Sequence, residues 1–189
     1  MKPKPISAVR PIQGPNRVLA RLEKPLIAPY LRLSRPEKLA QLASGMRDIE
    51  KRLRVFPKRM WDWSPKPGTH WCIREVLWHL ADSEANYYVR IRRAAAEPGA
   101  SVSPWDEGKW ALEGRYTKQP ADRAWAVLKT LREANRALAA ILPPTHWKRK
   151  VRHPDFGMMT LDRVVGTCLW HTRHHLGQME RRYQEWKNR

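Results

Sequence analysis

The sequence contains only two cysteines among its 189 residues, Cys72 and Cys168. Two thiols cannot build a disulfide framework, so the fold has to be held by an ordinary apolar core. The sequence also lacks any run of about 18 apolar residues, which predicts that no helix spans a membrane. Its first residues are basic but contain no apolar core of a secretory signal, so we expect a cytoplasmic protein.

Acidic residues are scarce, because 18 Asp and Glu face 37 Lys and Arg and give a formal net charge of +19. Such a field attracts nucleic acid, anionic lipid or anionic small molecules without identifying which. The ten tryptophans could stack on bases, which keeps nucleic-acid binding open as an alternative. They scatter over loops and helices, however, and no recognisable nucleic-acid motif accompanies them. A solvated basic surface explains the charge equally well.

The length predicts a single domain with a basic arm in front of it. Residues 1–35 are rich in proline and in Lys and Arg, and proline at this density favours extended backbone over helix. Apolar residues in its later half indicate that this half packs on the body of the protein. The arm could contact phosphates, pack on the surface or form a homodimer contact. Residues 36–189 are predicted to form the folded domain.

Apolar residues recur at alternating spacings of three and four in four long stretches, which is typical of helices that share one core. They predict an all-α, up-and-down-type four-helix bundle. Between the second and third stretches, residues 97–119 form a long irregular segment with large aromatics, either a lid over the bundle mouth or a seal for the core. Residues 145–159 show no assignable pattern. The predicted helices begin at Pro36, near Cys72, at Pro120 and after Thr160, and end before Pro57, near Ala96, near Leu142 and near Trp186.

Three histidines carry the candidate chemistry. His171 and His175 are four residues apart, so a helix places both on one face, whereas His174 belongs to a more outward row. His79 lies on the second helix in a polar row beside the apolar stripe. Three imidazoles with an open position are a common catalytic metal site. Solvent exposure or hydrogen bonds between helices explain the same spacing without a metal.

A metal held in this way can activate water at neutral pH or bind a thiol. Carboxylates often orient ligand histidines, and Glu75 and Asp82 each lie about one helical turn from His79. Cys168 precedes His171 on the same face and is either a further ligand or a small buried hydrophobe.

Two segments together resemble the DinB/YfiT-like superfamily. The first, residues 63–84, has a Pro-Gly loop followed by a helix with a Glu and a His-Leu-x-Asp-x-Glu pattern. The second has a Gly–Thr-Leu opening at residues 157–161 and a His-x-x-x-His-x-x-Gln pattern at residues 171–178. An acidic element, Asp106-Glu107, stands between them. The resemblance covers roughly residues 36–186.

The resemblance implies a four-helix bundle with a divalent metal, zinc or nickel, held by His79, His171 and His175. Gln178, at the end of the second pattern, is a further residue that could orient a ligand. Members include metal-dependent hydrolases of small molecules and S-transferases or isomerases that use low-molecular-weight thiols. A non-catalytic bundle stabilised by its metal stays open as an alternative. Cys72 departs from the family pattern, which has a serine cap there, so we expect Glu75 to share the capping.

Overall fold

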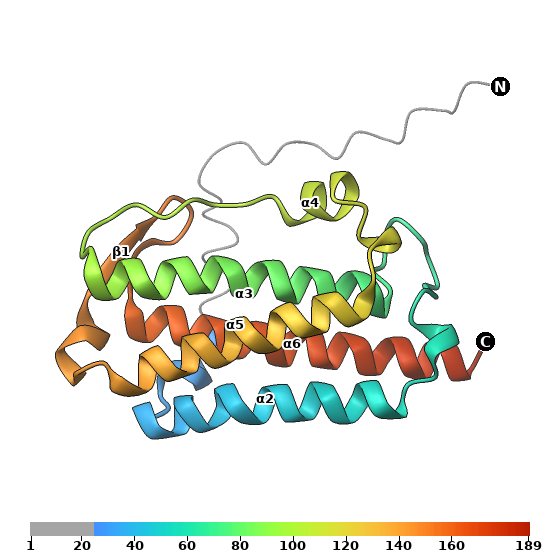
Figure 1. Cartoon of the computed structure of the whole chain (residues 1–189), viewed down its shortest axis with the longest axis horizontal. Coiled ribbons are helices and arrows are strands. Elements are labelled where there is room, and N and C mark those ends of the chain that lie inside the picture. Colours follow the sequence, from blue (N-terminus) through green and yellow to red (C-terminus); the bar gives the residue numbers. More distant parts are fainter. Residues whose placement is uncertain (1–24) are drawn as a thin grey trace.

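A computed structural model describes residues 25–189 as a four-helix bundle (Figure 1). The all-α bundle expected from the sequence is confirmed. No described helix is long and apolar enough to cross a membrane. The long helices are α2 (Arg35–Val55), α3 (Ile73–Ala96), α5 (Ala121–Ile141) and α6 (Leu161–Lys187). The short elements are η1 (Lys58–Met60), α4 (Glu107–Glu113), η2 (Tyr116–Lys118), η3 (Pro144–Lys148), β1 (Lys150–His153) and β2 (Gly157–Thr160).

The later part of the basic arm is helical, so the expectation of extended backbone is wrong for residues 25–31. Proline inside a helix costs about 3 kcal/mol. Burial of apolar side chains offsets this cost, because a fully buried Ile contributes about 1.5–3 kcal/mol and Ile27 is only 1% exposed. The segment lies so close to α6 that a Cβ at Gly166 would come within 2.9 Å of Leu31 Cδ2. Residues 1–24 of the predicted arm lie outside the described residues.

The helix starts follow from local capping. Ser34 and Glu37 form a reciprocal capping box at α2, with Ser34 N donating to Glu37 Oε2 at 2.6 Å. Thr160 caps α6 as predicted, because its Oγ1 accepts from Arg163 N at 3.0 Å. At α3 the backbone N–H of Cys72 donates to Glu75 Oε2 at 2.9 Å, which is the shared capping expected where a thiol replaces a hydroxyl.

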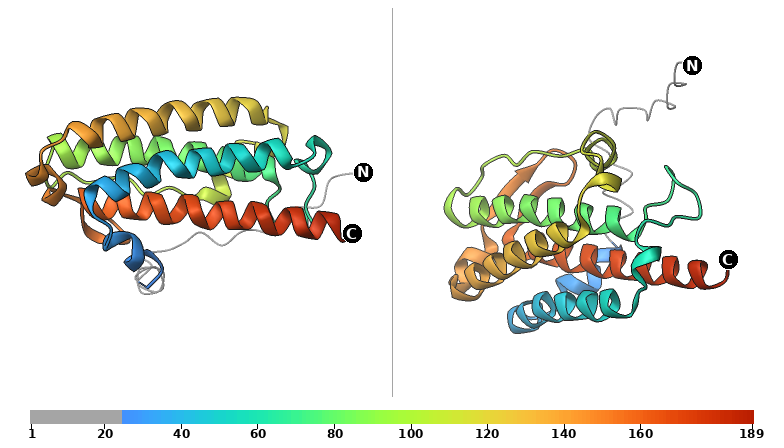
Figure 2. Two further views of the ribbon diagram at one scale, coloured as in Figure 1. Left: turned by 90° about the horizontal axis from the view of Figure 1, so that it is seen from below. Right: turned by 45° about the vertical axis from the view of Figure 1, so that its right-hand side comes forward.

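The connectivity departs from a strict alternation of helix directions. α2 and α6 run parallel to each other, α3 and α5 run parallel to each other, and the two pairs are antiparallel (Figures 1 and 2). α3 packs against α5 and α6, and α2 packs against the same two helices. Contacts between side chains show these directions. Asp48–Arg173 and Arg52–Glu180 join α2 and α6 in the same order along both helices, as do Glu84–Arg132 and Arg92–Asn135 for α3 and α5. His79–His171 and Glu84–Cys168 join α3 and α6 in opposite order.

Because α3 and α5 run the same way, the segment between them returns along the whole bundle (Figure 1). Its first part pairs with β1, where Val102 N donates to Arg152 O and Arg152 N donates to Ala100 O, both at 2.9 Å. β1 pairs with β2 in an antiparallel hairpin with Lys150 opposite Thr160. The segment predicted to be irregular therefore contains α4 and η2, and residues 145–159 contain a 3₁₀ turn and a hairpin.

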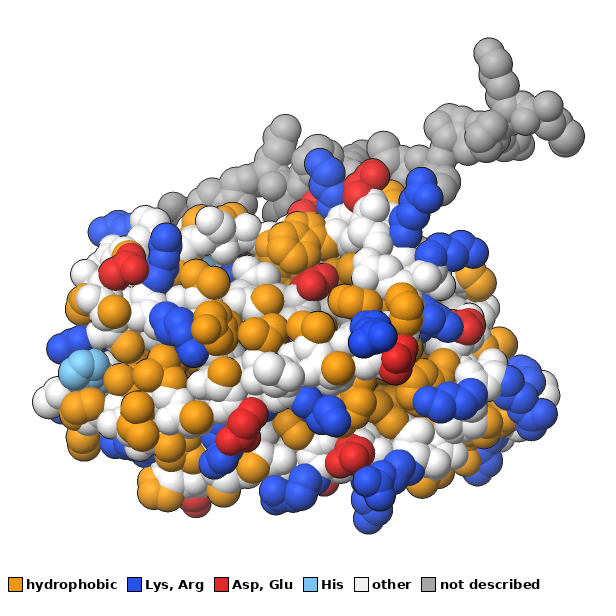
Figure 3. Space-filling model, in the orientation of Figure 1, with side chains coloured by type: hydrophobic (Ala, Val, Ile, Leu, Met, Phe, Trp, Pro, Cys, Tyr) orange, Lys and Arg blue, Asp and Glu red, His pale blue; other side chains and the backbone are white. Residues whose placement is uncertain are grey.

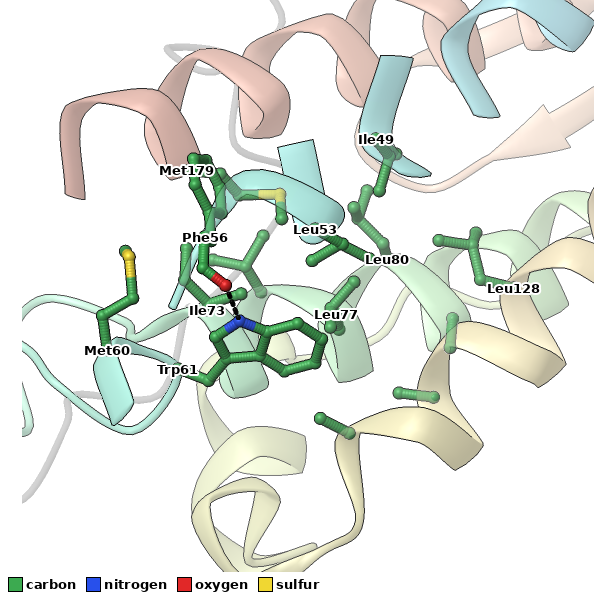
Figure 4. Packing of buried hydrophobic residues seen from close by; sticks show 14 of the residues in the cluster. Ile49, Leu53, Phe56, Met60, Trp61, Ile73, Leu77, Leu80, Leu128 and Met179 are labelled. Carbon is green, nitrogen blue, oxygen red and sulfur yellow. Dashed lines mark hydrogen bonds between the residues drawn. The ribbon is translucent and has the colours of Figure 1, made fainter. Parts of the chain in front are cut away.

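The core consists of two apolar clusters with a polar layer between them. One cluster fills the end of the bundle where α3 begins, and its side chains converge around Trp61, whose Nε1 donates to Phe56 O at 3.3 Å (Figure 4). The other fills the end near the hairpin. Along α6 the second cluster ends at Leu169 and the first resumes at Leu176, so the histidine pattern lies between them. This position brings polar side chains into the middle of the bundle.

Candidate metal centre

The Nε2 atoms of the three predicted histidines converge between α3 and α6. His79 Nε2 lies 2.8 Å from His171 Nε2, and His175 Nε2 lies 3.0 Å from the same atom. One ligand atom from each ring falls within 4.8 Å of those of the other two. The structure therefore brings together the three residues that the sequence selected, although His79 is 92 positions from His171.

The three rings differ in their access to solvent. His79 and His175 are buried, at 1% and 7% exposure, whereas His171 is only partly buried. His174 is exposed and faces away from the core, as its row on the helix predicts. The centre therefore opens to the outside past His171.

Burial keeps the triad neutral. Removal from water lowers the pKa of His79 to about 2 and that of His175 to about 4, with further lowering by neighbouring imidazoles. The pKa of His171 is also well below its usual value, again mainly because of burial. A neutral imidazole offers a lone pair, which is the form that binds a metal ion.

Gln178 is the one orienting candidate that contacts the triad among the described residues. Its Oε1 lies 2.7 Å from Nδ1 of His175, so this nitrogen donates and Nε2 keeps its lone pair for the centre. Glu75 caps α3 instead, and Asp82 accepts a hydrogen bond from the Tyr116 hydroxyl. Neither carboxylate hydrogen-bonds to a triad ring, because both point toward backbone and lid.

Aromatic side chains enclose the triad, and the sequence patterns did not indicate most of them. Trp71 lies against two of the rings, with centroids 4.7 Å from His79 and 6.4 Å from His175. Trp105, from the returning segment, stacks on His79 at 5.4 Å with an angle of 17° between the ring planes. This segment therefore covers the centre, as the lid interpretation of its aromatics expects.

A cavity of about 230 Å³ opens beside the exposed edge of His171. Its wall is mainly apolar, and α3, α6, the hairpin and the segment before α4 all contribute to it. Glu107, the first residue of α4, reaches toward the triad, with Oε2 3.9 Å from His79 Nε2. The remaining wall includes Ser83, Tyr87, Arg90, Trp105, Asp106, His153, Asp155, Phe156, Met159, Thr167 and Trp170.

A buried ion pair lies beneath the triad. Arg132 Nη2 donates to Glu84 Oε2 at 2.7 Å and to Thr172 Oγ1 at 2.9 Å. Asn135 donates to the other oxygen of Glu84 at 2.7 Å. Cys168 Sγ lies 3.6 Å from Glu84, and burial raises the pKa of its thiol. The thiol therefore belongs to this network, and Cys168 is not among the residues whose ligand atoms converge at the triad.

Comparison with known proteins places the chain in a family. The model of the DinB superfamily matches residues 41–179, which include all three histidines. The chain belongs to the DinB superfamily.

Relatives of this DinB superfamily member carry names that refer to metal. YfiT of Bacillus subtilis, named "Putative metal-dependent hydrolase YfiT", is 33% identical over 111 residues, or 58% of this chain and 62% of its own length. A protein of Oceanobacillus iheyensis with the same type of name is 32% identical over 109 residues, or 58% and 63%. A Bacillus mycoides protein named in the same way is 30% identical over 135 residues, or 71% and 73%. The matches thus span less than two thirds of the first and second of these relatives.

The fold is also that of a solved relative. The structure of Bacillus subtilis YfiT, described as a probable metal-dependent hydrolase with an unusual four-helix bundle topology, superposes with a TM-score of 0.74. The superposition covers 82% of this chain and 90% of YfiT at 24% sequence identity. The superposition supports the four-helix bundle architecture of this chain.

Proposed function

We propose that this protein is a metal-dependent hydrolase of a small molecule, with zinc or nickel held by His79, His171 and His175. The observation that carries the proposal is the convergence of three Nε2 atoms beside a cavity into which one of the three rings opens. The names of the relatives, which refer to metal-dependent hydrolases, agree with this proposal.

The donor set fits a divalent ion. The three rings are neutral at pH 7, and Gln178 fixes the tautomer of His175 so that its Nε2 faces the other two. Three imidazoles suit zinc, nickel, copper and iron alike, and zinc or nickel is the choice that the family resemblance implies. When bound, such an ion supplies Lewis acidity and lowers the pKa of a coordinated water to about 7.

The protein's own residues would position a substrate and limit access of solvent. Trp71 and Trp105 both lie against the His79 ring, and the cavity beside His171 offers an approach to the centre. Its volume of about 230 Å³ is below the usual range of drug-sized sites and therefore favours a small substrate. A reaction that needs a low-molecular-weight thiol stays a prediction from the family resemblance.

The face of the protein drawn in Figure 3 does not favour nucleic-acid binding over this proposal. On the face shown in Figure 3, Lys and Arg side chains are interspersed with apolar and acidic ones and form no continuous strip. Phosphate-tracking surfaces depend on such clustering of positive charge.

The proposal is tested by metal content and turnover in two variants of adjacent residues. We expect the purified protein to bind one divalent ion per chain and to hydrolyse members of a panel of small esters and amides. His175→Ala should lose both the metal and the turnover. His174→Ala is the matched control, because this residue is exposed next to the triad, and it should retain both.

Chelation separates the possible outcomes. Removal of the metal should abolish hydrolysis, and addition of zinc or nickel should restore it. Turnover that survives complete metal removal would contradict the proposal. Metal binding that raises the melting temperature without turnover on any substrate of the panel would favour the non-catalytic bundle instead.

A further inference from the structure

A carboxylate from the lid lies on the side of His79 where the three histidines converge. Glu107 Oε2 is 3.9 Å from Nε2 of His79, the same nitrogen that lies 2.8 Å from His171 Nε2. A carboxylate that orients a ligand histidine accepts from the nitrogen on the far side of the ring. That nitrogen is His79 Nδ1, which is buried with no hydrogen-bond partner among the described residues. Glu107 is therefore placed like a ligand and not like an orienting group.

The distance agrees with this placement. Within residues 25–189, Glu107 is the one acidic residue with an oxygen within 4.0 Å of a triad nitrogen. Two donor atoms that each lie about 2.0–2.2 Å from one tetrahedral zinc ion are about 3.3–3.5 Å apart. The observed separation from His79 Nε2 is only slightly larger, but Glu107 is not among the residues whose ligand atoms converge, so its exposed side chain has to turn inward to bind the ion.

The chain around Glu107 holds it over the triad. Trp105, two residues earlier, stacks on His79, and Asp106 caps α4 by accepting from Lys109 N at 2.9 Å. Beyond α4, the hydroxyl of Tyr116 donates to Asp82 on α3. These contacts hold the backbone on both sides of Glu107 beside α3, within reach of the triad.

A simpler role for Glu107 explains less. An acidic residue in the first turn of a helix interacts favourably with the helix dipole, and α4 offers this position. That interaction is satisfied by a carboxylate pointing anywhere near the helix end, including into solvent. It does not account for an oxygen directed at the nitrogen that faces His171.

We propose that Glu107 is a fourth protein ligand of the metal, supplied by the lid, and that it is exchangeable. The inference rests on the proposed metal centre. Three imidazoles come from the rigid bundle, whereas Glu107 has a side chain that is 63% exposed at the cavity mouth. Its negative charge offsets part of the charge of a divalent ion in a site walled by aromatics. A substrate entering beside His171 takes the place of this carboxylate.

The test compares Glu107→Gln with Glu113→Gln in protein loaded with Co²⁺. Glu113 lies on the same helix and lines a different hollow, with Lys109, Trp110 and Tyr116, so it is the matched control. The dissociation constant of Co²⁺ is measured by competition with a chromophoric chelator, and the ligand set is followed by the visible absorption of the bound ion. Melting of the metal-free proteins checks that both variants fold.

Glu107→Gln should raise the dissociation constant by at least about 10-fold, the smallest effect typical of losing a residue that only orients a ligand, and it should change the Co²⁺ spectrum. Glu113→Gln should match the wild type in both measurements. If Glu107→Gln binds Co²⁺ with the wild-type constant and spectrum, the fourth ligand is refuted while the three-histidine centre stands. If the wild type itself binds no Co²⁺, zinc or nickel, the centre is refuted, and the inference with it.

Discussion

Gln178 and His175 lie one turn apart on α6, with the amide oxygen 2.7 Å from the ring nitrogen that faces away from the triad. This contact selects one tautomer of His175 and directs the other nitrogen toward His79 and His171. The His-x-x-x-His-x-x-Gln pattern thus places Gln178 one helical turn after His175, where it sets the tautomer of that candidate ligand.

Replacement of Gln178 by Ala should therefore weaken metal binding without removing a ligand. The expected loss is about 10-fold or more in affinity, because residues that orient ligand histidines typically contribute this much. Gln184→Ala is the control, since Gln184 is exposed on the same helix and donates to Glu180. Isothermal titration with zinc measures both. Equal zinc affinities for the two variants would mean that the contact of Gln178 with His175 does not orient the His175 ring for metal binding.

The Glu84–Arg132 pair should be costly to break. Both side chains are at most 3% exposed, so removing one leaves an uncompensated charge in the core. Glu84→Ala is expected to lower the free energy of unfolding by about 3–5 kcal/mol, measured by urea denaturation.

Two further variants show whether this cost arises from the unpaired charge. The double variant Glu84→Leu with Arg132→Met should recover much of the loss, because no buried charge remains. Breaking the exposed Glu133–Arg136 pair by Glu133→Gln should change stability little. If the loss of stability in the double variant equals the sum of the losses in Glu84→Leu and Arg132→Met measured singly, this explanation is contradicted.

The metal-free protein should lose stability as the pH falls below about 6.5. Burial lowers the pKa of His175 and of His153 to about 4, and that of His79 to about 2. The unfolded chain takes up protons near pH 6.5, whereas the folded chain does not until much lower pH. The stabilisation is thus complete above pH 6.5 and declines by up to about 1.4 kcal/mol per pH unit for each histidine.

Urea unfolding of metal-free protein between pH 7.5 and pH 5 measures this slope. His153 lies outside the triad and is 2% exposed. His153→Gln should therefore reduce the slope of unfolding free energy against pH without changing any of the three candidate metal ligands. A free energy of unfolding that stays constant over this range would show that the rings take up protons in the folded state.

Gly114 sets the end of the lid helix. A Cβ at this position would overlap the backbone carbonyl oxygen of Trp110 and lie 3.3 Å from the Tyr116 ring, so the backbone has to move. Gly114→Ala is expected to speed amide hydrogen exchange in residues 107–118 and to leave α3 and α6 protected. Gly108→Ala, whose Cβ would meet only Asp106 Oδ1 at 3.6 Å, is the control. Equal exchange in both variants would show that the lid tolerates the change.

The sequence predicted the helices well because their signals are local. Pro36, Thr160 and the proline stops place the long helices within one or two residues of their observed ends. The pairing of His171 with His175 is equally local, since both lie on one helix. The match with His79 depends on how two distant helices align, and here the family resemblance supplied what spacing alone left open.

Other features depend on long-range packing and escaped the sequence patterns. Glu84 ends the His-Leu-x-Asp-x-Glu pattern, but the pattern does not indicate that its side chain is buried and paired with Arg132 on α5. The parallel direction of α3 and α5 also has no local signal, because a long connection permits either direction. The short strands β1 and β2 are stabilised partly by residues 99–102, so their own sequence was insufficient to reveal them.

Because α3 and α5 run in the same direction, the segment that contributes to the cavity wall is separate in the sequence from the helices that carry the histidines. The long connection that this topology requires passes along α3 (Figure 1). It contributes Trp105, Asp106 and Glu107 to the cavity wall, while the histidines belong to α3 and α6. Insertions or exchanges within residues 97–119 can therefore alter what enters the cavity and leave the imidazoles in place. Exchanging this connection between family members would test whether it sets which small molecules enter the cavity.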